Sequence, residues 1–430
     1  MPSDSTHAQN FLQRLLLDQS KEELLQRLEP HISYQEQRVA GGAHITPEIV
    51  ERRWRRITAP PGVRATLLPA VCDTLSCYSR NIENFIGLVQ LPVGLAGPLR
   101  VNGLFAQGDY YLPLATTEAA LVASYHRGAC LLSQIGGCSA MLLAEGVSRS
   151  PGFAFATARQ AGLFAAWVLE HLEEIRGAAQ ATTSHGSLQD LRITIEGNHV
   201  YLLLEFLTGD ASGQNMATIA TEAACALIME QTPVRPDYFF VEANMSGDKK
   251  ASAQSFLSVR GKKVTAEAII PAELVAQLLH TTPARMCDYW RMSALGGVLS
   301  GTIGVQGHYA NGLAALYIAC GQDAACIAES AVGVTRFEVR PDGGLYAAVT
   351  LPNLMVGTVG GGTALPTQKA CLELMGLYGA GHARALAEVC AGMALAGELS
   401  IIGALAAGEF TRAHRKLARG KDLANGASHE

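Results

Sequence analysis

Between residues 151 and 241, strand patterns and helix patterns alternate in an order that few folds accommodate. Two alternating strands meet across Gly197-Asn198, a two-residue turn typical of a β-hairpin. The order βαββαβ is that of a ferredoxin-like split βαβ unit, so we predict a small domain over 151–241, inserted into a larger one. Its expected elements are strands at 153–156, 192–196, 199–206 and 238–241 and helices at 158–176 and 213–231.

The remaining sequence divides around this insertion. Residues 1–70 predict a small helical region with polar turns. Residues 71–150 and 242–419 alternate Ala- and Gly-rich helices with short apolar strands, and they predict a large α/β substrate-binding domain built around a central helix. The polar tail at 420–430 is expected to be disordered. The predicted fold class is therefore α+β.

Composition limits what the chain can bind. Apolar residues make up 49% of the chain and aromatic residues only 6%, so we expect a core of small aliphatic side chains. A formal net charge of -5 gives no field that would attract nucleic acid or an anionic membrane. The 10 cysteines form no CxxC pair and no cluster at metal-ligand spacing, which predicts reduced thiols, no metal and a cytoplasmic protein. The apolar stretch at 385–410 is interrupted by Glu388, Glu398 and Glu409, and it predicts a buried helix or helix pair in place of a membrane span.

A Gly- and Ser-rich segment, MSGDKKASAQSFLSVRGKK at 245–263, places Lys249 and Lys250 directly after Asp248. A lysine can stabilise a developing oxyanion where its ammonium is desolvated and held by neighbouring charges. The alternative for this segment, taken alone, is a solvated basic loop. An electrophilic lysine is therefore predicted only in combination with the other segments of the chain.

Three further segments combine small residues with one isolated ionisable group: LATTEAALVASYHRG around Glu118, YIACGQDAAC around Asp323, and GELSIIGALAAGEFTRAH ending in His414. A fourth, VGTVGGGT at 356–363, allows backbone to approach a ligand or a partner chain closely. Taken singly, Glu118 could be the first-turn acid of a helix, Asp323 could satisfy a buried backbone group, and His414 could be a surface histidine. Asp323 is predicted to lie on a long buried helix within 300–328.

Together these segments resemble the 3-hydroxy-3-methylglutaryl-coenzyme A (HMG-CoA) reductase family. The resemblance covers roughly residues 75–418, with the segments in the family's order. ENFIGLVQLPVGLAGPL and YIACGQDAA look closer to the class I, eukaryotic and archaeal branch than to the bacterial degradative branch, as in a soluble prokaryotic member. The resemblance implies four-electron reduction of (S)-HMG-CoA to (R)-mevalonate and free coenzyme A with two NADPH, in the mevalonate pathway of isoprenoid biosynthesis.

The resemblance assigns four catalytic roles. Lys249 would stabilise the oxyanion of the hemithioacetal and later the alkoxide. Glu118 would deliver a proton to the aldehyde-stage oxygen, and His414 would protonate the departing coenzyme A thiolate. Asp323 would couple to Lys249 and Glu118 and tune both.

The same resemblance implies a set of substrate contacts. A guanidinium suits bidentate binding of the acyl carboxylate, and this role falls to Arg149. Glu242 stands where relatives carry a substrate-binding serine, and Met292 where they carry a lysine. The implied substrate-binding residues are Arg149, Asn244, Asp248, Lys250, Asn311, Ser124 and Arg127.

A nicotinamide cofactor would have to bind outside a Rossmann motif, because the chain has neither GxGxxG before a helix nor a GxxxxGK[ST] loop. In LTGDASGQNMAT a strand leads into a helix whose first N–H groups could face a phosphate. The alternative is an ordinary helix start capped by Asp210 or Ser212. The resemblance places the cofactor here and at the glycine run, although relatives carry methionines where Ser212 and Gln214 stand. The implied cofactor-binding residues are Asp210, Ser212, Gly213, Gln214, Asn215, Gly360 and Gly361.

Several alternatives stay open from the sequence. NADPH is favoured over NADH, although Leu207 and His185 stand where charged residues of the family help to choose between the two. Other functions compatible with the residues are an NADH-using or mevalonate-degrading reductase, a related reductase of another acyl-CoA, and a non-catalytic acyl-CoA-binding protein. The resemblance implies a homodimer or higher homo-oligomer with shared active sites and with HMG-CoA and coenzyme A as ligands.

Overall fold

The computed structural model describes residues 13, 16–17, 20–23, 44–55, 61–68, 75–79, 81–183 and 185–409. The chain forms two compact units, Met1–Leu88 and Val89–Glu430. The predicted disordered tail and His414 lie outside the described residues, as does much of the predicted N-terminal helical region.

The described part of the first unit consists of short helical segments around a small apolar core. Its elements are α3 (Pro47–Trp54), α4 (Val63–Leu67) and the 3₁₀ helix η1 (Leu75–Tyr78). Helix α3 begins as its sequence dictates, because the Thr46 side chain accepts a hydrogen bond from the Ile49 N–H and proline occupies the first position. The core side chains are Ile45, Val50, Trp54, Leu75 and Phe85.

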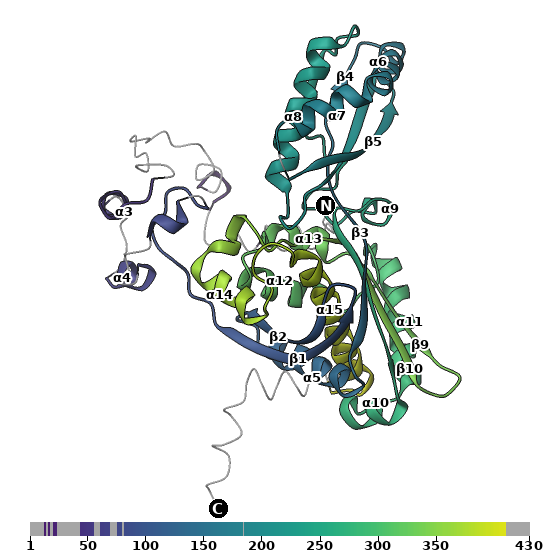
Figure 1. Ribbon diagram of the computed structural model, residues 1–430. Helices are drawn as coiled ribbons and strands as arrows, with labels where there is room; N and C mark the ends of the chain where they lie inside the picture. The colour runs from purple at the N-terminus through teal and green to yellow at the C-terminus, as the bar shows by residue number, and fades with distance from the viewer. Residues whose placement is uncertain are drawn as a thin grey trace, which may run out of the picture. The chain divides into compact units, whose positions relative to one another are not determined.

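Residues 151–241 of the second unit follow the predicted order of strands and helices, except that two helices replace the first predicted one. These are β4 (Gly152–Ala154), α6 (Ala158–Glu170), α7 (Leu172–Gln180), β5 (Ser187–Glu196), β6 (His199–Leu207), α8 (Gln214–Gln231) and β7 (Tyr238–Phe240). The strands lie in the order β7-β4-β6-β5 with every neighbouring pair antiparallel, as in a split βαβ unit. Figure 1 shows α6, α7 and α8 gathered beside these strands. The status of 151–241 as a separate inserted domain stays a prediction.

The prediction of a single helix at 158–176 is wrong. The backbone leaves the helical region at His171, with φ -109° and ψ 22°, so that α6 ends and α7 begins there. The His171 ring, whose Nδ1 lies 2.8 Å from the carbonyl oxygen of Trp167, gives that carbonyl a partner outside the helix ladder.

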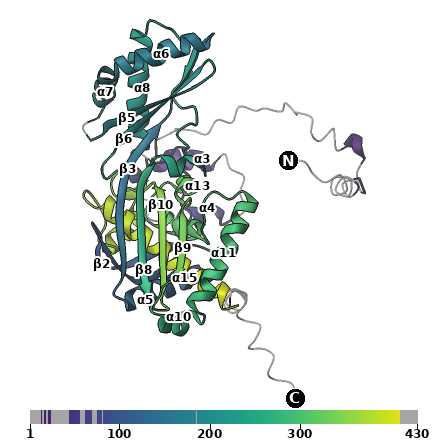
Figure 2. The ribbon, with the colours of Figure 1, turned by 90° about the vertical axis from the view of Figure 1, so that its right-hand side faces the viewer.

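One ten-stranded mixed sheet runs through the second unit. Its further strands are β1 (Val93–Gly103), β2 (Gln107–Ala115), β3 (Cys138–Arg149), β8 (Gly261–Ile270), β9 (Val334–Val339) and β10 (Leu345–Leu354). Strand β3 joins the two parts of this sheet, because Ser139–Gly146 pair with β8 and Val147–Arg149 pair with β6. Figure 2 shows β3, β8 and β10 side by side, with helices around them. The combination of helices with this sheet confirms the predicted α+β class.

The long helix α15 (Ala383–Ala406) is central to the second unit. It packs against α5 (Leu121–Gln134), α12 (Tyr309–Ala319) and strands β3, β8 and β10 (Figure 1). Its length and composition would suffice to cross a membrane, but 89% of its most apolar window is buried inside the protein, as in a core helix. The prediction of a buried helix in this stretch is therefore confirmed.

A buried helix, α12, lies within the predicted range 300–328, but the prediction that this helix carries Asp323 is wrong. Helix α11 (Pro283–Ser300) ends at Gly301, which has φ 74°, and α12 stops at Ala319 before Gly321 turns the chain with φ 69°. Asp323 therefore follows a helix and is not part of one. The remaining helical segments are α9 (Gln254–Leu257), α10 (Ala272–Leu279), η2 (Ala324–Cys326), α13 (Ile327–Ser330), η3 (Gly361–Ala364) and α14 (Pro366–Leu374).

Candidate active site

Lys249 lies in the 245–250 loop with a left-handed backbone conformation, φ 56°. This conformation is uncommon for a residue with a long side chain, and it is held by a hydrogen bond of 3.3 Å from the Lys249 N–H to Glu329 Oε1. The Lys249 ammonium Nζ lies 2.9 Å from Asp323 Oδ2. The hydrogen bond with Asp323 is the main cause that raises the pKa of Lys249, so the ammonium is charged at neutral pH.

Asp323 is the cap of the 3₁₀ helix η2, where its Oδ1 accepts a hydrogen bond of 3.0 Å from the Ala325 N–H. Burial opposes ionisation of Asp323, but the hydrogen bonds from Lys249 and Ala325 lower its pKa overall. The Lys249 and Asp323 side chains are 40% and 41% exposed, so the ion pair is open to a ligand. The predicted coupling of Asp323 to Lys249 is present in the structure.

A buried network of charges supports the lysine loop. Asp248 accepts hydrogen bonds from Arg149, at 2.6 Å, and from Arg260. Arg260 Nε lies 2.6 Å from Glu329 Oε2, whereas Glu329 Oε1 accepts the hydrogen bond from the Lys249 N–H. Burial would raise the pKa of Asp248, but the charge of Arg260 and the hydrogen bond from Arg149 hold it below its ordinary value. Arg149, the residue predicted to bind the substrate carboxylate, is thus already engaged by a carboxylate of its own chain.

Two other predicted substrate residues, Asn244 and Lys250, are exposed on this loop. The Lys250 ammonium donates to the backbone oxygen of Asp248 at 2.8 Å. Glu242 accepts from the Asn244 N–H at 2.7 Å and from the Ser246 hydroxyl at 3.0 Å. Glu242 therefore stabilises this segment by hydrogen bonds within it.

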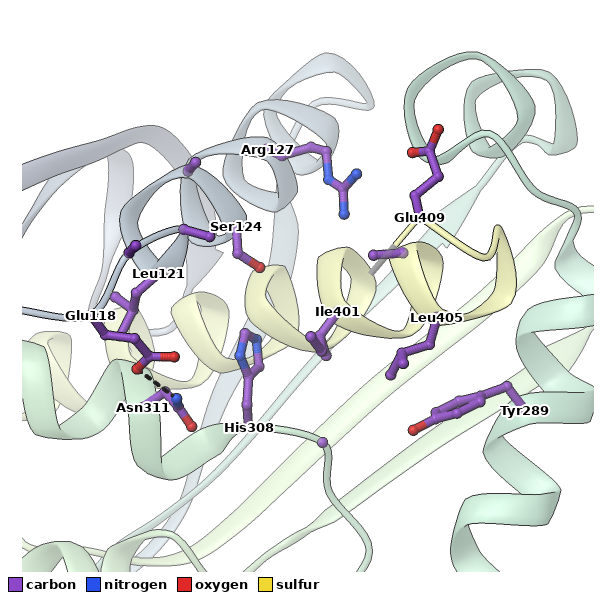
Figure 3. Close-up of a pocket in the computed structure, with 15 residues that line it drawn as sticks. Glu118, Leu121, Ser124, Arg127, Tyr289, His308, Asn311, Ile401, Leu405 and Glu409 are labelled. Carbon is purple, nitrogen blue, oxygen red and sulfur yellow. Dashed lines mark hydrogen bonds between the residues drawn. The ribbon is translucent and has the colours of Figure 1, made fainter. Parts of the chain in front are cut away.

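A second group of predicted residues lines a cavity of about 510 Å³ beside α15 (Figure 3). Glu118 Oε2 accepts a hydrogen bond of 2.9 Å from Asn311 Nδ2 at one end of this cavity (Figure 3). His308 lies beside them and stacks on Tyr125 with a ring-centroid distance of 4.9 Å. Burial lowers the pKa of His308, so its ring is neutral at pH 7. The interpretation of Glu118 as a first-turn acid is wrong, because α5 begins only at Leu121.

The cavity runs along α15 towards Glu409 (Figure 3). Arg127 donates to the Ser400 hydroxyl at 3.0 Å and to its carbonyl oxygen at 2.6 Å, and the Ser124 hydroxyl donates to the Ser400 hydroxyl at 3.0 Å. Between the ends, the α15 side chains that line the wall are apolar, Ile401, Ala404 and Leu405. The arrangement suits an elongated ligand with a polar end and an apolar body.

The two predicted cofactor segments lie against each other. The Thr358 N–H donates to the backbone oxygen of Asp210 at 2.8 Å. A Cβ added at Gly357 would lie 2.5 Å from the backbone nitrogen of Ser212, so only glycine permits this approach. The Gln322 amide binds both backbone groups of Gly357, at 2.8 and 2.9 Å. The segment that carries Asp323 therefore joins the same group.

Asp210 is half-buried, and its carboxylate accepts hydrogen bonds from the Gly381 N–H at 2.8 Å and the Ala383 N–H at 3.1 Å. Helix α8 begins after Gly213, which has φ 75°, and no side chain caps it. The alternative of a helix start capped by Asp210 or Ser212 is therefore wrong. The first N–H groups of α8 keep the geometry that favours an anion.

The glycine run presents open backbone beside this helix start. Gly360 and Gly361 have φ of 74° and 55°, and a Cβ at either position would meet no atom within 4 Å. Both positions favour glycine because their φ angles are positive, and empty space remains beside their Cα atoms. Of the other predicted cofactor residues, Asn215 is exposed and Gln214 is buried.

Within one chain, the predicted catalytic residues form two separate groups. Glu118 accepts a hydrogen bond from Asn311 near the start of α12. Asp323, the partner of Lys249, lies beyond the end of this helix. Helix α12 rises about 12 Å between Asn311 and its last residue at 1.5 Å per residue. In the described part of the chain, no hydrogen bond or ion pair joins Glu118 to the Lys249–Asp323 pair.

His414, the fourth predicted catalytic residue, lies outside the described residues, and its role stays a prediction. Three residues of the site went unrecognised in the sequence: Arg260, Glu329 and His308. Arg260 belongs to the lysine segment, and Glu329 is an isolated acid shortly after Asp323, which was an available signal. No sequence signal distinguishes His308 from an ordinary core histidine.

Comparison with known proteins gives a consistent result. A family model described as hydroxymethylglutaryl-coenzyme A reductase matches residues 50–419. The 3-hydroxy-3-methylglutaryl-coenzyme A reductase of Pyrococcus abyssi is 45% identical over 356 residues, covering 81% of this chain and 86% of that protein. The protein of the same name from Methanothermobacter thermautotrophicus is 43% identical over 343 residues, covering 79% and 86%. Both relatives are archaeal, in agreement with the predicted branch.

The chain is also similar to a solved structure, that of the class II 3-hydroxy-3-methylglutaryl-CoA reductase from Streptococcus pneumoniae bound to NADPH in open conformations. The TM-score is 0.63 at 19% sequence identity, with 83% of this chain and 96% of that chain covered. At this identity, the likeness demonstrates a shared fold.

Proposed function

The chain belongs to the hydroxymethylglutaryl-coenzyme A reductase family, and from this premise we propose that it reduces HMG-CoA to mevalonate and free coenzyme A with two NADPH. The observation that carries the proposal is the exposed ion pair of 2.9 Å between Lys249 and Asp323. It places a charged ammonium where a carbonyl oxygen can reach it. A charged donor of this kind can stabilise the oxyanion that forms when a thioester is reduced.

The reaction divides into two reductions, for each of which the bound nicotinamide supplies one hydride. In the first, Lys249 stabilises the hemithioacetal oxyanion on the carbonyl oxygen. The C–S bond then breaks, and His414 protonates the coenzyme A thiolate. In the second, Lys249 again binds the oxygen while Glu118 delivers the proton that converts the alkoxide to the alcohol. Asp323 holds Lys249 in its charged form throughout.

The residues at the start of α8 fit a dinucleotide. The N–H groups after Gly213, which no side chain caps, would face a phosphate, and the space beside Gly360 and Gly361 would admit the cofactor. Asp210 and Thr358 would act indirectly, because each is engaged in holding the two segments together.

Purified protein is expected to oxidise two NADPH for each free thiol released from HMG-CoA, and NADH more slowly. Absorbance of each cofactor and thiol titration would measure this stoichiometry. A faster reaction with NADH would support the degradative alternative, and activity confined to another acyl-CoA in a substrate panel would replace the proposed substrate.

The described cysteines are all free, which supports the proposed cytoplasmic location.

The separation of the two catalytic groups supports a homodimer in which each active site combines Glu118 and Asn311 of one chain with Lys249 and Asp323 of the other. Both groups would then reach one carbonyl across the subunit interface. Each chain would contribute to two sites.

Mixing Glu118→Ala and Lys249→Ala chains during refolding or co-expression is therefore expected to restore activity, although each variant alone is inactive. In a random mixture about half of the dimers are hybrid and each hybrid keeps one intact site, which predicts about a quarter of wild-type turnover. Lys249→Ala mixed with Asp323→Ala is the matched control, since both residues belong to the same half-site and no hybrid is intact. Restored activity in the control mixture would contradict shared active sites. So would a lack of restored activity in both mixtures.

A further inference from the structure

The Arg149 side chain joins the start of α8 to the loop that carries Lys249. This side chain is only 9% exposed, and its guanidinium donates hydrogen bonds in two directions. Towards α8, Nε donates to the Thr218 hydroxyl at 2.9 Å and Nη2 makes a longer contact of 3.5 Å with the Gln214 carbonyl oxygen. Towards the loop, Nη1 donates to Asp248 Oδ2 at 2.6 Å. Because Asp248 directly precedes Lys249, one buried cation connects the helix to the lysine loop.

The Thr218 hydroxyl has one arrangement that satisfies both of its neighbours. A guanidinium can only donate and a carbonyl oxygen can only accept, whereas a hydroxyl does both. The Thr218 proton therefore points to the Gln214 carbonyl oxygen, 2.9 Å away, and a lone pair of the hydroxyl faces Arg149 Nε. Gln214 lies one helical turn before Thr218, so α8 itself holds the hydroxyl in this orientation. Thr218 thereby restricts rotation of the Arg149 guanidinium.

Arg149 has a second carboxylate close by. Glu242 Oε2 lies 3.6 Å from the same Nη1 atom that donates to Asp248. Without its acceptor at Nε, the guanidinium would be free to turn towards Glu242 and to release Asp248. The hydroxyl of Thr218 therefore favours one of two carboxylate partners of Arg149.

We propose that Thr218 is a positioning residue that keeps Arg149 directed at Asp248 and so couples the start of α8 to the Lys249 loop. The consequence for ligands rests on the proposed function. A cofactor bound at α8 and a thioester bound at the loop would each stabilise the arrangement that the other requires, so that each binds more tightly in the presence of the other.

Hydrogen exchange measured by mass spectrometry tests the connection without any ligand. Thr218→Val keeps the shape of the side chain but removes the hydroxyl, and we expect deuterium uptake at 245–250 to become about 3- to 10-fold faster, as for the loss of one hydrogen bond. Thr218→Ala should have the same effect, and Thr218→Ser should exchange as the wild type does. Uptake in α15 should stay unchanged in all three variants.

Thr221→Val is the matched control for this experiment. Thr221 is a buried threonine of the same helix, and its hydroxyl has no hydrogen-bond partner among the described residues. Its replacement should leave uptake at 245–250 as in the wild type. Wild-type uptake at 245–250 in both Thr218→Val and Thr218→Ala would overturn the proposal, and so would an equal rise in α15, which indicates general destabilisation.

Binding of two ligands tests the coupling itself. Calorimetric titration with NADP⁺, with which HMG-CoA does not react, is carried out with and without saturating HMG-CoA. In the wild type, HMG-CoA is expected to lower the Kd of NADP⁺ about 10-fold, and in Thr218→Val this factor should fall to about 2 or less. Thr218→Ser and Thr221→Val should keep the wild-type factor.

The two experiments separate the proposal from the proposed function. A wild-type protein that binds both ligands without coupling would overturn the proposal. A Thr218→Val protein that keeps the full coupling would overturn it too, even if its kcat fell. A wild-type protein that binds neither ligand would refute the proposed function alone, because hydrogen exchange would still test the connection.

Discussion

Replacing Lys249 by alanine is expected to lower kcat for HMG-CoA reduction by about 1,000-fold or more. The ammonium is the charged donor of the Lys249–Asp323 pair, and the proposed mechanism uses it in both reductions. Its removal leaves the oxyanion without a counter-charge, whereas the buried network below the loop stays intact because Lys249 enters that network through its backbone N–H. Steady-state turnover with NADPH, together with circular dichroism to verify folding, would measure the effect.

The matched control is Lys369→Ala. Lys369 on α14 pairs with Glu373, and its side chain is 44% exposed, so its loss removes the same charge from outside the Lys249–Asp323 pair. Turnover of this control should stay close to that of the wild type. A Lys249→Ala enzyme that kept a tenth or more of wild-type turnover would remove Lys249 from the mechanism.

Replacing Glu398 by alanine is expected to lower the free energy of unfolding by about 3–5 kcal/mol. This carboxylate lies fully buried in α15 and accepts hydrogen bonds from the Gly307 N–H at 2.7 Å, the His308 N–H at 2.8 Å and the Thr335 hydroxyl at 2.8 Å. Alanine would leave these buried donors without their acceptor and would open a cavity. Urea unfolding monitored by circular dichroism would measure the change.

Glu338→Ala is the control for this effect, because Glu338 forms an exposed pair with Arg336 and should cost less than about 1 kcal/mol. The pH dependence provides a second test. Burial raises the pKa of Glu398 above 4.5, so the folded protein binds the proton more tightly than the unfolded chain. The stabilisation from this group is complete below pH 4.5 and is lost as pH rises through the folded-state pKa. The stability difference between wild type and Glu398→Gln should therefore shrink with rising pH; a difference that grows would contradict this assignment.

The sequence correctly predicted features that depend only on neighbouring residues. The hairpin across Gly197-Asn198 is present because its two-residue turn and the alternating strands depend on neighbouring residues alone. The prediction that a helix carries Asp323 was wrong. The helix ends before Gly321, which has a left-handed backbone conformation, and the spacing of apolar residues does not indicate such a turn.

The pairing of Lys249 with Asp323 joins segments far apart in the chain, and no period or spacing predicts it. Only the family resemblance brought the two residues together. The engagement of Arg149 by Asp248 and of Asp210 by the start of α15 depends on tertiary packing in the same way. Sequence reasoning therefore named these residues as ligand contacts, although their side chains are engaged within the chain.

Strand β3 belongs to both parts of the large sheet, and this has a mechanical consequence. Its last residues, Val147–Arg149, are hydrogen-bonded to β6, while its earlier residues are hydrogen-bonded to β8. A tilt of the β4–β7 portion cannot occur about a loose linker; it has to bend β3 itself. Because Arg149 ends this strand and holds Asp248, such a bend would act as a lever on the loop that carries Lys249. Through Arg149 and Asp248, motion of this portion of the sheet would therefore reach the loop that carries Lys249.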